Sequence, residues 1–120
     1  VGMVVQVQEE GHLDVATGIS GSGPAFLYRI ADNMIQVGVS SGLSYQAALT
    51  MTAQTLIGAG KMLIETGIKP ETLIQNVSSP NGTTVAGLTI FDEQALDHRI
   101  QAVVRAAINR ADELSKGDHT

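Results

Sequence analysis

Apolar residues recur at the spacing of a helix face along most of this chain. The most regular run lies near the C-terminus, where successive apolar residues are separated by one or three positions, as on one side of an amphipathic helix. This run consists of Ile100, Val103, Val104, Ala107, Ile108, Ala111 and Leu114. The spacing predicts a long C-terminal helix with one apolar face.

Start and stop signals divide the region before this run into further helices. Pro24 suits the first turn of a helix that continues to Gly38, with Ser22 or Gly23 as the preceding cap. Ser44 predicts the N-cap of a longer helix that ends at Gly67. Pro70 opens a short helix through Val77, and a further helix follows residues 83–84.

The N-terminal residues follow a different pattern. Residues 3–8 are β-branched and alternating, which predicts a short strand without a partner within hairpin distance. Residues 18–23 are rich in glycine and serine, but their order is not that of a dinucleotide-binding loop and no strand–helix–strand unit follows. We interpret them as a turn that enters the helix at Pro24.

The long helix predicted after Ser44 carries a broad stripe of small residues. Gly58 and Gly60 lie within it, and each glycine costs about 1 kcal/mol relative to alanine in a helix interior. Close backbone packing explains that cost, so we expect another helix to cross there.

Composition restricts the function more than it specifies it. The 120 residues carry a net charge of −5 and contain no cysteine, which excludes disulfides and thiolate zinc sites. Seven basic residues without a basic stripe make nucleic acid an unexpected partner, and we identify neither a signal peptide nor a membrane span. His12, His98 and His119 lack the spacing of metal ligands, so no metal is expected.

The charged fraction of 16% is low for a single soluble domain, which indicates either a neutral polar surface or a surface covered by a partner.

The segment Ser78–Thr84, with the sequence SSPNGTT, is the strongest candidate for a functional site. Its simplest interpretation is a capped helix start in which Asn81 and Gly82 tolerate positive φ. The functional interpretation is an anion site formed by the N–H groups of Gly82, Thr83 and Thr84 with neighbouring hydroxyls. Because the segment contains no lysine or arginine, the predicted ligand is small and singly charged, as a carboxylate is.

Three motifs together resemble one family. The segments 17–26 (TGISGSGPAF), 58–63 (GAGKML) and 76–88 (NVSSPNGTTVAGL) are similar to the C-terminal domain of pyrroline-5-carboxylate reductase, and the similarity extends from about Asp14 to Leu114. The third motif is nearly diagnostic. Asn81 stands where the family commonly has glycine, a change that a left-handed turn tolerates.

The resemblance implies an all-α dimerisation domain of the 6-phosphogluconate-dehydrogenase C-terminal-like type. Residues 14–120 would form it, and residues 1–13 would be the last strand of a Rossmann domain with its linker. It further implies NAD(P)H-dependent reduction of 1-pyrroline-5-carboxylate to L-proline in the cytoplasm by a homodimer, with NADP or NAD held mainly by the N-terminal domain. Whether the dimers assemble further stays open, as does the choice between NADH and NADPH.

The resemblance also assigns roles within the third motif. The residues implied to hold the substrate carboxylate are Ser79, Pro80, Asn81, Gly82, Thr83 and Thr84. Thr84 would place its hydroxyl near the ring nitrogen, as the catalytic residue, and Asn76 and Val77 would lie near the nicotinamide.

The missing cofactor fingerprint leads to one further expectation: these 120 residues alone form a folded dimer without reductase activity. A non-catalytic helical homodimerisation module is the alternative. A reductase of another imine or ketone is disfavoured because the SSPNGTT loop is complete.

Overall fold

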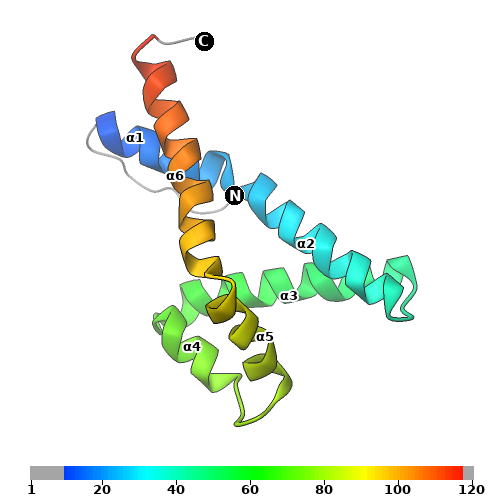
Figure 1. Ribbon diagram of the computed structural model, residues 1–120. Helices are drawn as coiled ribbons and strands as arrows, with labels where there is room; N and C mark the ends of the chain where they lie inside the picture. Colours follow the sequence, from blue (N-terminus) through cyan, green and yellow to red (C-terminus); the bar gives the residue numbers. More distant parts are fainter. Residues whose placement is uncertain (1–9, 118–120) are drawn as a thin grey trace. The chain divides into compact units, whose positions relative to one another are not determined.

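A computed structural model describes residues 10–117 of the chain, and these residues form only helices and the loops between them (Figure 1). The elements are α1 (Glu10–Ala16), a π-helix η1 (Thr17–Gly21), α2 (Gly23–Ser40), α3 (Tyr45–Thr66), α4 (Pro70–Asn76), α5 (Thr83–Glu93) and α6 (Leu96–Ser115). The predicted all-α class is confirmed for this part of the chain. The strand predicted for residues 3–8 lies outside the described residues, and residues 10–13, expected in a linker, belong to α1. None of the described helices is long and apolar enough to cross a membrane.

The start and stop signals of the sequence act as predicted at three helix ends. Ser44 is the N-cap of α3, and its hydroxyl accepts a hydrogen bond of 3.1 Å from the N–H of Ala47. Gly67 ends the same helix in the left-handed conformation, with φ of 67°. Pro70 occupies the first turn of α4, where its missing N–H is not needed.

The described residues divide into two compact units, and the division falls within α2. The first unit combines residues 10–27 with residues 95–117, and the second is Tyr28–Gln94. In the first unit, α1 and η1 pack against α6 (Figure 1). In the second unit, α2 and α3 approach each other near their connecting turn, where a Cβ on Gly38 would lie 3.1 Å from the Cβ of Ala48.

The glycine-rich segment that the sequence predicts as a turn is helical instead. The hydroxyls of Thr17 and Ser20 donate to the carbonyl oxygens of Leu13 and Ala16, at 2.9 and 2.8 Å. Gly18 is buried, and a Cβ built on it would overlap Cγ1 of Ile108 in α6. The interpretation as a turn was wrong because packing against α6 outweighs the local preference of glycine and serine for irregular structure.

The contact between Gly18 and Ile108 leads to a first prediction. We expect Gly18→Ala to destabilise the protein by about 1–3 kcal/mol, because the added methyl group forces α6 away from η1. Thermal unfolding followed by circular dichroism measures the effect. Gly11→Ala in α1 is the matched control, since a Cβ there meets nothing within 4 Å and alanine favours a helix. Equal melting temperatures for Gly18→Ala and the native protein would contradict this packing.

Few side chains are buried in the second unit. Ile35 in α2 and Ala48 in α3 are the buried apolar residues, and Thr52 in α3 is buried as well. Gly58 and Gly60 face open space, since a Cβ on either meets nothing within 4 Å. The described residues supply no helix that crosses at these glycines, so the small-residue face of α3 is not covered by the chain itself.

Candidate functional site

The residues predicted for the site form one continuous segment, from the last residue of α4 to the second residue of α5. Asn76 ends α4, Val77 is its C-cap, and Thr83 and Thr84 begin α5. The loop Ser78–Gly82 joins the two helices, as Figure 1 shows for α4 and α5. The structure thus places the start of a helix directly beside the end of the preceding one.

A tight turn fixes the shape of this loop. The N–H of Gly82 donates to the carbonyl oxygen of Ser79 at 2.9 Å, with Pro80 and Asn81 between them. Asn81 has φ of 59°, which confirms the predicted positive φ there, whereas Gly82 has φ of −85° and does not need glycine for its backbone conformation. Glycine is required at this position for space, because a Cβ would overlap Oγ of Ser79 and lie 3.1 Å from its carbonyl oxygen.

The N–H groups available to an anion differ from those predicted. The Gly82 N–H is occupied by the turn, so the sequence-based assignment of this donor was wrong. Gly82 is the N-cap of α5, and the N–H groups of Thr83, Thr84 and Val85 follow it in the first turn, where a helix supplies no acceptors. Val85 was missed because its side chain is apolar, although a helix N-terminus offers backbone donors whatever the side chain.

The hydroxyl groups of the segment fall into two kinds. Ser78 donates to the carbonyl oxygen of Ile74 at 2.6 Å, and Thr84 donates to that of Val77 at 3.2 Å. Gly82 is the N-cap of α5 and no side chain caps this helix, so the helix start predicted from the sequence lacks a side-chain cap. The exposed hydroxyls of Ser79 and Thr83 are the hydroxyl donors that remain for a ligand.

The charge around the loop favours a small anion. The first turn of α5 contains no acidic residue, and the N-terminal end of a helix carries partial positive charge. Residues 70–98 contain no lysine or arginine. Oriented N–H groups without fixed cations suit a single carboxylate better than a polyphosphate.

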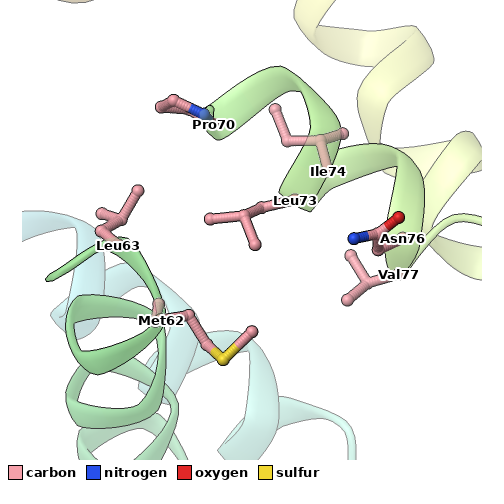
Figure 2. A pocket seen from close by; sticks show the side chains of 8 residues that line it. Met62, Leu63, Pro70, Leu73, Ile74, Asn76 and Val77 are labelled. Atoms are coloured by element: carbon pink, nitrogen blue, oxygen red, sulfur yellow. The ribbon is translucent and has the colours of Figure 1, made fainter. Parts of the chain in front are cut away.

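An apolar groove of about 320 Å³ lies beside this loop, between α4 and the C-terminal half of α3. Figure 2 shows Met62 and Leu63 on one side and residues of α4 on the other, with Asn76 as the polar side chain among those labelled. Val77 is 71% exposed at the end of α4. The sequence did not single out Met62 and Leu63 as part of a site, because apolar helix residues usually belong to a core.

A second hollow, of about 270 Å³, lies in the first unit and is polar. It is lined by Gly11, Asp14, Asp112, Ser115 and Lys116. Lys116 forms an ion pair of 3.0 Å with Asp112, and the hydrogen bond and charge of Asp112 raise the pKa of Lys116 above its ordinary value. Residues 10–117 bring together no group of three His, Asp or Glu side chains that could hold a metal ion. The ion pair between Lys116 and Asp112 at the end of α6 therefore accounts for the charged character of this hollow.

The fold leaves many large apolar side chains exposed on its helices, among them Tyr28, Ile57, Ile64 and Val77. Exposed apolar side chains of this kind are typical of an all-helical domain that buries its apolar faces by packing against another chain. Residues 10–114 match the family described as pyrroline-5-carboxylate reductase dimerisation, and the chain belongs to this family.

Relatives and solved structures agree with this assignment. Pyrroline-5-carboxylate reductase 1 of Bacillus spizizenii is 42% identical over 96% of this chain and 38% of its own length. The reductase of Methanosarcina acetivorans is 41% identical over 97% of this chain and 43% of its own length. This chain therefore spans about two fifths of the length of the curated relatives it matches.

Among solved structures, the pyrroline-5-carboxylate reductase of Coxiella burnetii aligns with a TM-score of 0.88 at 34% identity, covering 95% of this chain and 42% of that one. The Plasmodium falciparum enzyme, solved with NADP bound, aligns with a TM-score of 0.84 at 30% identity, covering 90% and 41%. The likeness in three dimensions thus covers nearly the whole of this chain.

Proposed function

We propose that this chain is the helical, dimer-forming part of an enzyme that reduces 1-pyrroline-5-carboxylate to L-proline. The observation that carries the proposal is the turn from Ser79 to Gly82, which holds the first-turn N–H groups of α5 open beside the end of α4 in a chain of the reductase dimerisation family. The substrate carries one carboxylate, which matches a loop that offers donors but no fixed cation.

The loop residues have different roles in binding the substrate. The N–H groups of Thr83 and Thr84 and the hydroxyls of Ser79 and Thr83 would donate to the carboxylate. Pro80 and Asn81 shape the turn, and Gly82 leaves the space it needs. Thr84 would place its hydroxyl at the ring nitrogen, so that the ring is oriented for attack at the imine carbon.

NADP or NAD is the proposed cofactor, since a relative of this chain was solved with NADP bound. When bound, a reduced nicotinamide supplies the hydride that the reaction needs. Asn76 and Val77 offer an amide and an exposed apolar side chain, which suit the nicotinamide ring and its carboxamide. With no lysine or arginine in residues 70–98, this segment is suited to the nicotinamide end rather than to the phosphates.

A second copy of this chain is the proposed partner. The family is described by dimerisation, and the open face of α3 at Gly58 and Gly60 offers a place for close helix packing. We further propose that the dimer acts in the cytoplasm, and that dimers can associate further.

The experiment that tests this function uses the whole natural protein that contains the chain. We expect it to oxidise NADPH or NADH when pyrroline-5-carboxylate is added, and to bind L-proline in calorimetry. L-prolinamide, which lacks the carboxylate, is expected to bind about tenfold to a hundredfold more weakly, since hydrogen bonds to a charged group are lost.

Two outcomes would contradict the proposal. Equal affinity for L-proline and L-prolinamide would show that the loop does not bind the carboxylate of the ligand. Absence of reduction with either nucleotide, in a protein that still forms dimers, would favour the non-catalytic dimerisation module.

A further inference from the structure

The loop between α4 and α5 contains an asparagine followed directly by a glycine, Asn81 and Gly82. The side-chain carbonyl carbon of an asparagine and the nitrogen of the next residue can close a five-membered ring, and a following glycine has no Cβ to hinder the closure. The other asparagines, Asn33, Asn76 and Asn109, lie in α2, α4 and α6 and precede methionine, valine and arginine. Asn81 is therefore the asparagine of this chain that is most open to attack by its own backbone.

The structure restrains the backbone at Asn81 but not its side chain. The side chain is exposed, and among residues 10–117 no hydrogen bond holds its amide. The backbone is held by the turn, in which Asn81 has φ of 59° and the Gly82 N–H donates to the carbonyl oxygen of Ser79 at 2.9 Å. While this hydrogen bond is formed, the Gly82 nitrogen is not available as a nucleophile.

Building on the proposed function, we propose that Asn81 is a site of spontaneous deamidation, that opening of the turn from Ser79 to Gly82 controls its rate, and that the modification closes the carboxylate site. The chain itself supplies the nucleophile and the leaving group. A carboxylate bound at the first turn of α5 holds the turn closed and protects Asn81, so the loop is modified only while no ligand is bound.

The reaction balances with water as the only co-reactant. When the turn opens, the Gly82 nitrogen attacks the side-chain carbonyl carbon of Asn81, and a new C–N bond forms. The C–N bond to the side-chain amino group breaks, and this group leaves as ammonia with the proton of the Gly82 N–H. Water then adds to either carbonyl of the resulting succinimide ring and breaks one ring C–N bond. The products are aspartate and isoaspartate, and in both an uncharged amide has become a carboxylate.

The new carboxylate lies beside the donors that the substrate needs. Position 81 directly precedes Gly82, the N-cap of α5, where the partial positive charge of a helix start attracts negative charge. The new carboxylate therefore competes with the substrate carboxylate for the N–H groups of Thr83 and Thr84 and also repels it, and no lysine or arginine of residues 70–98 neutralises it. Isoaspartate in addition lengthens the main chain by a carbon atom, which disrupts the turn.

A timed incubation of the whole natural protein at mildly alkaline pH tests the proposal. Peptide mapping by mass spectrometry is expected to show conversion at Asn81 and none at Asn33 or Asn109 over the same period. A synthetic peptide of residues 76–88 is expected to convert faster, because nothing holds its Gly82 nitrogen. L-proline at about ten times its dissociation constant is expected to slow conversion in the protein by about tenfold, since the ligand-free fraction falls by that factor, and to leave the peptide unaffected.

Calorimetry with L-proline on the same samples measures the consequence for the site. The converted protein, separated by anion exchange through its added negative charge, is expected to bind L-proline at least about tenfold more weakly. Asn81→Asp carries this charge from the start and is expected to show a similar loss. Asn81→Gly has no side-chain amide, so incubation is expected to leave its affinity at its own starting value.

Each of the remaining outcomes overturns a stated part of the proposal. If Asn81 stays intact in the protein while the peptide converts, it is not a modification site. If protein and peptide convert equally fast, or if L-proline binds without slowing the conversion, the turn does not control the rate. Conversion with unchanged affinity would show that the site stays open. If the native protein neither binds L-proline nor reduces pyrroline-5-carboxylate, the proposed function fails, whereas mass spectrometry still decides whether Asn81 is modified.

Discussion

Replacing Ile57 by aspartate is expected to dissociate the proposed homodimer and to lower its melting temperature strongly. Ile57 and Ile64 are 62% and 66% exposed on α3, and Gly60 lies between them on the same side of the helix. If this face packs against a second copy, the variant buries a carboxylate without a partner. An uncompensated buried charge costs about 3–5 kcal/mol, which raises the dissociation constant by about a hundredfold or more.

Sedimentation velocity at micromolar concentration measures this effect. Gln46→Glu is the control, because it adds one negative charge at an exposed position in the first turn of α3, where negative charge is tolerated. We expect the control to remain dimeric. We also expect the Ile57→Asp monomer to lose helicity on mild heating. Among the described residues the buried apolar side chains are those of Ile35 and Ala48, and so small a core gives a monomer little stability. A monomeric native protein, or an Ile57→Asp variant that remains dimeric, would show that this face is not the interface.

Sequence signals that act over a few residues predicted most of the fold. The cap at Ser44, the left-handed Gly67 and the helix start at Pro70 depend on neighbours within one turn, and each is found in the structure. The π-helix was not predictable in this way, because Gly18 is helical through its contact with Ile108, ninety positions away in the sequence. Contacts at that separation leave no periodic signal in the segment itself.

The candidate site shows the same division. The position of the loop, the absence of cations and the positive φ of Asn81 could be predicted from the sequence. The hydrogen bond that occupies the Gly82 N–H could not be predicted, because it forms only when the turn brings the Ser79 carbonyl oxygen to 2.9 Å from the Gly82 nitrogen. The direction of the Thr84 hydroxyl depends in the same way on where α4 ends. The sequence therefore identifies the donors and acceptors, whereas the backbone path decides which of them remain available.

Adding one methyl group at position 82 is expected to abolish ligand binding while leaving the helices intact. The backbone of Gly82, with φ of −85°, is accessible to alanine, so Gly82→Ala introduces no conformational strain of its own. The new Cβ would overlap Oγ of Ser79 and press against the carbonyl oxygen that accepts the Gly82 N–H. The turn must open, which moves the first-turn N–H groups of α5 away from a common point. Losing two or more hydrogen bonds to a carboxylate predicts that L-proline binds about a hundredfold more weakly or not at all.

Calorimetry with L-proline and thermal unfolding of the same samples separate binding from stability. Asn81→Gly is the matched control, since glycine adopts the positive φ of this position without steric strain and should leave L-proline affinity within about threefold of the native value. Combining Ser79→Ala with Gly82→Ala removes the overlapping hydroxyl and leaves the 3.1 Å contact with the Ser79 carbonyl, so binding should recover in part. Native affinity for L-proline in Gly82→Ala would exclude this loop as the carboxylate site. A change confined to the loop leaves the faces of α3 untouched and should not reduce helicity. If Gly82→Ala lost as much helicity as is expected for Ile57→Asp, the turn would instead be needed for the stability of the fold.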